Sequence, residues 1–245
     1  MRQYYSCYYG CDWWPLLLAK NILRPRRFLT RWWYGNVWRT HSIQSPLHQH
    51  GIQCWPGHFE SFARVVNQRY PLSRHRGVGY QGEGYIPIGG DVVHDPMILA
   101  CLSSYFACSP VIREPFHHTV AIPYEDMKPT RSMRAADEPF NVGWHYDTPN
   151  LVQLVILLND VSDTDSHMQY ARGEHRRLRV NLTKWDYYYS DEYAERHFDV
   201  VKCVGPIGTA YLFDTNAPHR FYMVKDSMRA MIKVGYTPGN AVLFP

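Results

Sequence analysis

An apolar run at residues 151–158 constrains the fold of this chain more than any other feature of its sequence. Pro149-Asn150 precedes the run and Asn159-Asp160 follows it, and its length suits a strand. An apolar run of this kind is typical of a strand that is buried on both faces. The run therefore predicts a strand with packed material on each side.

The sequence around this run predicts helices first and strands later. Residues 58–70 have helical spacing of their apolar side chains and stop before Pro71, and a second helix is predicted from Asp95-Pro96 through Phe106. Further short strands are predicted at residues 111–124, 200–204, 208–213 and 229–236. This order favours a mainly β protein with flanking helices (α+β), built as an antiparallel barrel with a helical N-terminal layer.

Length and composition are those of one globular domain: 245 residues, of which 45% are hydrophobic and 20% are charged. Residues 1–57 are predicted to form an irregular, aromatic arm, and residues 73–91 a glycine-rich, turn-rich segment. Residues 1–40 hold seven basic residues and one acidic residue. The arm is therefore either a surface for an anionic partner or an extension that packs its aromatic rings while its arginines stay in water.

The six cysteines form no C-x-x-C pair, which favours free thiols in a reducing compartment. The apolar stretch at residues 13–19 is interrupted by Pro15 and is too short to cross a bilayer. We therefore expect a cytoplasmic protein with no membrane partner. The oligomeric state is left open.

Residues 141–148, with the sequence NVGWHYDT, carry the first part of a candidate metal site. In an extended strand, residues two apart share a face, so His145 and Asp147 are expected to point the same way, although a simple His–Asp hydrogen bond is an alternative. His219 follows the predicted strand 208–213 after a turn and supplies a second imidazole. Two imidazoles and one carboxylate form the facial arrangement of non-haem iron(II) oxygenases, which leaves positions open on the metal.

Arg229 lies ten residues after His219 and opens the predicted strand 229–236. A guanidinium can pair with both oxygens of a carboxylate, so we predict that Arg229 holds the distal carboxylate of 2-oxoglutarate. An exposed strand edge is the alternative for an arginine at this position.

Together these landmarks resemble the phytanoyl-CoA dioxygenase-like group of iron(II)- and 2-oxoglutarate-dependent oxygenases. Residues 159–161 and 164–176 align without gaps on the group's pattern D-V … G-P-L-Q-F-V-P-G-S-H-R. The matching positions include Gly173, His175 and Arg176, and the departures are Ser166, His167, Arg172 and Glu174. Residues 213–215, with the sequence FDT, also match the group's approach to its last metal ligand.

The resemblance covers residues 95–240 and implies a double-stranded β-helix, a jelly-roll or cupin-like barrel with the metal at its open end. This core would belong to a single domain of residues 1–245, with residues 1–90 as an N-terminal arm and a helical, glycine-rich layer. The resemblance also implies that His175 organises a loop and does not bind the metal. Lys128 resembles a lysine that contacts the co-substrate in some members, with a surface role as the alternative.

The predicted function is that of an Fe(II)- and 2-oxoglutarate-dependent dioxygenase with His145, Asp147 and His219 as catalytic metal ligands. It would hydroxylate, desaturate or cyclise a small molecule and release succinate and CO2. O2 is the second co-substrate, and ascorbate is expected to support activity. Two alternatives stay open: a non-oxidative, metal-binding cupin-like isomerase or binding module, and an oxygenase that modifies nucleic acid held by the basic N-terminal arm.

Overall fold

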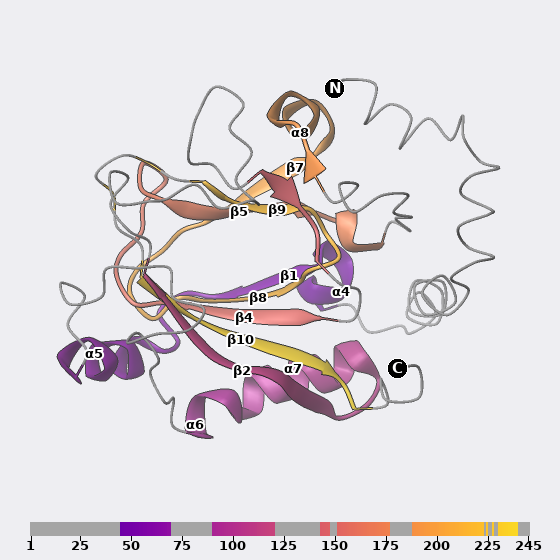
Figure 1. Ribbon diagram of the computed structural model, residues 1–245. Helices are drawn as coiled ribbons and strands as arrows, with labels where there is room; N and C mark the ends of the chain where they lie inside the picture. Colours follow the sequence, from indigo (N-terminus) through magenta and orange to yellow (C-terminus); the bar gives the residue numbers. More distant parts are fainter. Residues whose placement is uncertain are drawn as a thin grey trace.

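Two antiparallel five-stranded sheets face each other in the computed structural model of the protein (Figure 1). The structure describes residues 45–69, 90–120, 143–147, 151–176, 188–222, 224, 227 and 230–239. The arm at residues 1–40 lies outside these ranges, as does the glycine-rich segment except for its last two residues. No helix in the described ranges is long and apolar enough to span a membrane.

The first sheet, called sheet A here, has the strand order β1-β8-β4-β10-β2, and the second, sheet B, has the order β6-β3-β9-β5-β7. The strands of sheet A are β1 (Ile52–Trp55), β8 (Ala210–Asp214), β4 (Val152–Leu157), β10 (Ala230–Pro238) and β2 (Pro110–Val120). The strands of sheet B are β6 (Tyr188–Tyr189), β3 (Trp144–His145), β9 (His219–Tyr222), β5 (His167–Arg172) and β7 (Asp199–Cys203).

Successive strands cross between the sheets from β2 to β5 and again from β7 to β10. This connectivity is the jelly-roll arrangement of a double-stranded β-helix. The predicted fold class is therefore confirmed. None of the described strands pairs with strands of both sheets, so the two sheets stay open at their edges and do not close into a barrel.

Strand β4 lies at the centre of sheet A, between β8 and β10, and every one of its residues is buried. Leu154 and Ile156 belong to a core cluster with the helices, whereas Val155 and Leu157 belong to the cluster between the two sheets. The prediction of a strand buried on both faces is confirmed, because one face of β4 meets the helical layer and the other meets sheet B.

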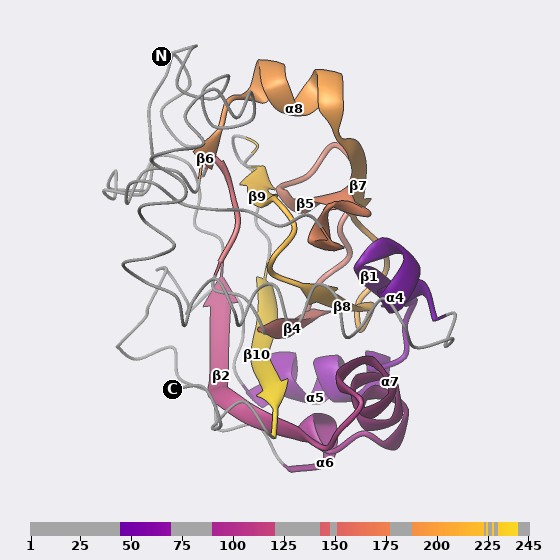
Figure 2. The ribbon, with the colours of Figure 1, turned by 90° about the vertical axis from the view of Figure 1, so that its right-hand side faces the viewer.

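Three helices cover the outer face of sheet A (Figures 1 and 2). They are α5 (Glu60–Arg69), α6 (Gly90–Val93) and α7 (Pro96–Phe106). Both predicted helices, α5 and α7, are confirmed. On the other side of the molecule, α8 (Asp191–His197) packs on the outer face of sheet B, and the 3-10 helix η4 (Glu174–Arg176) follows β5.

The prediction that residues 1–57 form an irregular arm is wrong for the part that the structure describes. Residues 46–50 form helix α4 (Pro46–His50), and β1 follows it and pairs with β8 at the edge of sheet A. Gly51 makes the turn between them with a φ of 74°, and a Cβ there would lie 2.3 Å from the Tyr170 hydroxyl oxygen. The local sequence does not predict β1 because its pairing partner is distant in the chain.

Helix α7 begins at the predicted position because Asp95 caps it. One carboxylate oxygen of Asp95 accepts hydrogen bonds from the backbone N–H groups of Met97 and Ile98, each at 3.0 Å. We expect Asp95→Ala to lower the free energy of unfolding by about 0.5–2 kcal/mol, because these two N–H groups lose their acceptor. Urea denaturation measures the change. Asp95→Asn keeps an acceptor oxygen and should lose less, so equal losses for both variants would contradict the capping role.

Candidate metal centre

The alternation of side chains along and beyond β3 directs His145 and Asp147 to one face. Trp144 and Tyr146 are each 1% exposed and pack in the cluster under α8, on the outer face of sheet B. The residues between and after them, His145 and Asp147, therefore point to the inner side. The large aromatic residues fix the register of the short strand, since a shift by one residue would bury the imidazole and the carboxylate under α8.

His219 joins this pair because it lies directly opposite His145 in the neighbouring strand β9. Cross-strand neighbours in an antiparallel pair hold their side chains close together, and the centroids of the two imidazole rings are 4.6 Å apart. The Asp147 carboxylate lies 4.0 Å from Nε2 of His145 and 3.6 Å from Nε2 of His219. The three ligand atoms all lie within 4.8 Å of one another, so the structure brings the three predicted residues together.

Backbone carbonyl groups orient both imidazoles in the same way. Nδ1 of His145 lies 2.9 Å from the carbonyl oxygen of Gly143, and Nδ1 of His219 lies 3.0 Å from that of Ala217. A carbonyl oxygen can only accept, so in the neutral form of each imidazole Nδ1 carries the proton and Nε2 keeps its lone pair. Both lone pairs are on the nitrogens that face Asp147. Metal-binding histidines use this tautomer and this kind of contact to a backbone carbonyl group.

The charges at the site also suit a cation. Burial and the neighbouring His219 lower the pKa of His145 to about 4, so its imidazole is neutral near neutral pH. Burial acts to raise the pKa of the Asp147 carboxyl, but the neighbouring His219 and His145 together hold that pKa well below its usual range. The Nε2 atoms of the two imidazoles and one ionised carboxylate thus lie on one face. These donors fit a divalent transition metal such as iron(II).

The turn between β8 and β9 places His219, and residues outside the motif hold that turn. The Asp214 carboxylate accepts hydrogen bonds from the Tyr105 hydroxyl of α7 and from the backbone N–H of Asn216. The carbonyl oxygen of Thr215 accepts from the backbone N–H of Asp147 at 2.9 Å, which ties the turn to the β3 segment. The contact from Asp214 to Asn216 is readable from sequence as an Asx turn, but nothing in the sequence assigns Tyr105 to this turn.

Arg220 supports the site from behind, on the outer face of sheet B. Its guanidinium lies 5.0 Å from the centre of the Trp144 ring and donates to the side-chain oxygen of Gln169 at 2.8 Å. It also pairs with Asp191 at the start of α8. Arg220 of β9 thus contacts β3 through the Trp144 ring, β5 through Gln169 and α8 through Asp191. Because Arg220 follows His219 directly, its contacts fix the strand segment that presents the imidazole.

The other predicted site residues have different outcomes. Arg229 and Lys128 lie outside the described residues, so their contact with a co-substrate stays a prediction. His175 is buried in η4, and its Nε2 lies 3.1 Å from the carbonyl oxygen of His48 in α4. This contact links the short helices η4 and α4, as expected for a histidine that organises the chain around it.

No family model matches the chain, and no curated protein has a significantly similar sequence. Solved structures do resemble it. The resemblance is one of fold. The non-heme alpha ketoglutarate dependent carbocyclase SnoK from nogalamycin biosynthesis superposes with a TM-score of 0.55 at 15% identity, over 80% of this chain and 85% of SnoK.

Two ligand-bound structures are similar to the same extent. EctD from S. alaskensis, solved with 2-oxoglutarate and 5-hydroxyectoine, has a TM-score of 0.58 at 13% identity over 80% of this chain and 76% of EctD. The epimerase SnoN, in complex with Fe3+, alpha ketoglutarate and nogalamycin RO, has a TM-score of 0.56 at 15% identity over 80% of this chain and 82% of SnoN. At these identities the comparison establishes a common jelly-roll fold.

Proposed function

We propose that this protein is an iron(II)- and 2-oxoglutarate-dependent oxygenase of the phytanoyl-CoA dioxygenase-like kind that acts on a small molecule. The observation that carries the proposal is the position of His145 directly opposite His219, with Asp147 facing the Nε2 atoms of both. Proteins of the same fold supply independent support, since EctD and SnoN are named with 2-oxoglutarate or alpha ketoglutarate, and SnoN also with iron.

In this proposal His145, Asp147 and His219 hold the metal on one side and leave its other side free for ligands. When bound, iron(II) and 2-oxoglutarate supply the oxidising power from O2, with succinate and CO2 as by-products. Arg229 and Lys128 remain the proposed contacts for the co-substrate. The chain's own part is to hold the ligands in place, keep both imidazoles in the metal-binding tautomer, and position the substrate.

The type of oxidation is the finer part of the proposal. We propose hydroxylation of the substrate, or desaturation or cyclisation by the same machinery. The names of similar structures include a carbocyclase and an epimerase, so this fold serves more than one outcome. Ring closure and hydroxylation both begin with removal of hydrogen from the substrate, and the position of the substrate beside the metal decides between them.

The test combines a binding measurement with a turnover measurement. Protein loaded anaerobically with iron(II) is titrated with 2-oxoglutarate by calorimetry, and then exposed to O2 and ascorbate while succinate is quantified. We expect one equivalent of 2-oxoglutarate to bind only when metal is present, and slow succinate release even without the substrate. Protein that binds iron(II) but neither binds nor consumes 2-oxoglutarate would instead be a non-oxidative metal protein, and the proposal would be wrong.

A further inference from the structure

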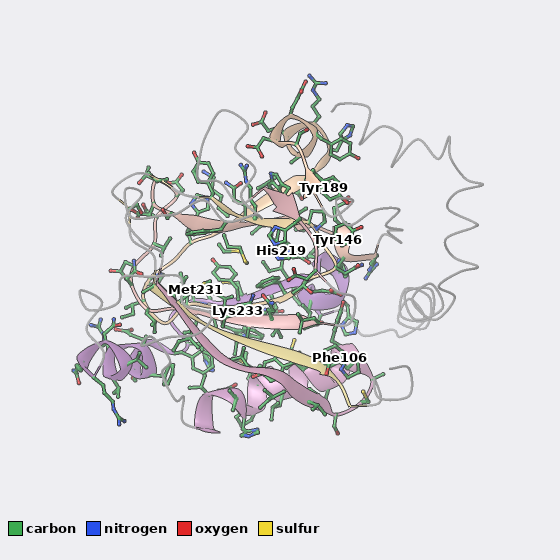
Figure 3. The ribbon with its side chains drawn as sticks, viewed as in Figure 1. Phe106, Tyr146, Tyr189, His219, Met231 and Lys233 are labelled. Atoms are coloured by element: carbon green, nitrogen blue, oxygen red, sulfur yellow. The ribbon has the colours of Figure 1, made fainter. Side chains whose placement is uncertain are left out.

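A lysine of sheet A faces the metal centre. On strand β10, Ile232 and Val234 pack with the helices on the outer face, whereas Met231 packs in the cluster between the sheets. Lys233 lies between Ile232 and Val234 in the strand, so its side chain points to the opposite face from theirs. It shares that face with Met231 and points toward sheet B. Figure 3 shows Lys233 and His219 in the region between the two sheets. Burial has the largest influence on the pKa of His145 and of Asp147, and the charge of Lys233 lowers both pKa values by a smaller amount.

A buried glutamine of β4 lies next to this lysine. Gln153 is 2% exposed and shares the inner face with Val155, the residue that pairs with Lys233. Across the sheet, Gln153 is opposite Phe213 of β8, whose ring centroid is 5.5 Å from that of His219. Gln153 therefore lies in the row of residues that contacts the metal centre. Lys233 lies in the next row, roughly 7 Å along the strands.

Neither side chain has a partner within the protein as far as it is described. Among the residues that the structure describes, Gln153 and Lys233 make no side-chain hydrogen bond and no ion pair. The Gln153 amide and the Lys233 ammonium can therefore donate to a ligand that enters the space between the sheets. Gly235, opposite Gln153 on β10, contributes no side chain of its own to this surface.

We propose that Lys233 and Gln153 bind a carboxylate group of the primary substrate and so hold it beside the metal. One ammonium and one amide N–H supply one positive charge and a second donor, which suits a singly charged carboxylate better than a doubly charged phosphate. The inference rests on the proposed function. In the proposed function, Arg229 binds the carboxylate of 2-oxoglutarate that is distant from the metal. Lys233 is therefore left to bind a carboxylate of the primary substrate.

The same surface indicates what the rest of that substrate is like. Within β4, β8 and β10, the inner-face neighbours of Lys233 and Gln153 are apolar or aromatic: Val155, Tyr211, Phe213 and Met231. The Tyr211 hydroxyl already donates to the carbonyl oxygen of Val204, so the ring is the part of this residue left for contact. The substrate class is thus a small carboxylic acid with an apolar body, whose acid group fixes which carbon lies near the metal.

The experiment uses manganese(II) in place of iron(II), because its unpaired electrons speed the relaxation of nearby ligand protons. Full-length protein is saturated with manganese and 2-oxoglutarate. The probes are butanoate and phenylacetate, each matched to its neutral amide. In the unmodified protein we expect stronger relaxation of the acids than of the amides, by about tenfold. Lys233→Met should lower the relaxation rates of the acids to those of their amides, whereas Lys233→Arg should keep the difference between acid and amide. Gln153→Leu should lower this difference by a smaller factor than Lys233→Met.

Calorimetry of metal and 2-oxoglutarate binding accompanies each variant and reports folding and co-substrate binding separately. We expect Lys233→Met to bind both with affinities within about twofold of the original protein, because it keeps the ligands and a side chain of similar length. The inference is overturned if neither acid exceeds its amide, if Lys233→Met leaves the difference intact, or if it weakens 2-oxoglutarate binding instead. Failure of the unmodified protein to bind 2-oxoglutarate would overturn the proposed function itself.

Discussion

Alanine in place of His145, Asp147 or His219 is expected to lower the affinity for iron(II) by more than about 100-fold, because loss of an outer partner of a metal ligand alone costs about 10–100-fold. Each of the three supplies one of the ligand atoms that converge within 4.8 Å. Metal content after dialysis and anaerobic titration with iron(II) give the measurement. We expect 2-oxoglutarate-dependent succinate formation to be lost in parallel, since the chelate needs the ion.

His94→Ala is the matched control, since His94 is exposed and lies at the end of α6, on the opposite side of sheet A from the metal centre. It should bind metal and 2-oxoglutarate as the original protein does. Circular dichroism and thermal unfolding of the metal-free proteins separate loss of ligands from loss of fold. Stoichiometric iron binding by Asp147→Ala or His219→Ala with unchanged affinity would contradict the assignment of these residues as ligands.

Ile156→Ala is expected to lower the free energy of unfolding by about 2–5 kcal/mol, since it leaves a cavity in a closely packed core. Ile156 is fully buried in the central strand of sheet A, in the cluster shared with the helices. Chemical denaturation measures the change. This position lies on the face of β4 turned away from the metal centre, so the folded variant should still bind metal.

Val65→Ala is the control for this stability measurement. Val65 belongs to α5 but is 60% exposed, so its loss of two methyl groups should change the free energy of unfolding by less than about 0.5 kcal/mol. A loss below about 1 kcal/mol for Ile156→Ala would mean that the site collapses around the smaller side chain. The interface between sheet A and the helices would then be less rigid than the packing indicates.

The local elements that the sequence predicted well are those with strong local signals. Turn residues on both sides mark the ends of the apolar run of β4, and Asp95-Pro96 marks the start of α7. Both elements are found where expected. The local sequence does not predict helix α4 or strand β1. Their positions depend on Gly51 fitting closely against Tyr170 and on pairing with β8, and neither contact is local in sequence.

In the candidate metal centre, too, local sequence predicts some features, whereas contacts between distant segments set the others. The spacing of His145 and Asp147 determined that they share a face, because side chains alternate along any strand. The supports contributed by Tyr105 and Arg220 come from other elements and were not predicted. Gln153 is a polar residue within an otherwise apolar run, and its position in the row beside the candidate metal centre follows only from the register of β4 with β8 and β10.

By itself, then, the sequence determined a mainly β protein with flanking helices, the central strand and three candidate metal ligands, because periodicity and residue chemistry are properties of short segments. The jelly-roll arrangement was implied by the resemblance to a known family. Only the tertiary structure decided that His145 lies directly opposite His219, and that Lys233 faces the same centre from the other sheet. The physical reason is strand register. A shift of one residue turns a side chain to the opposite face of its sheet, and register is set by packing between segments that are far apart in the chain.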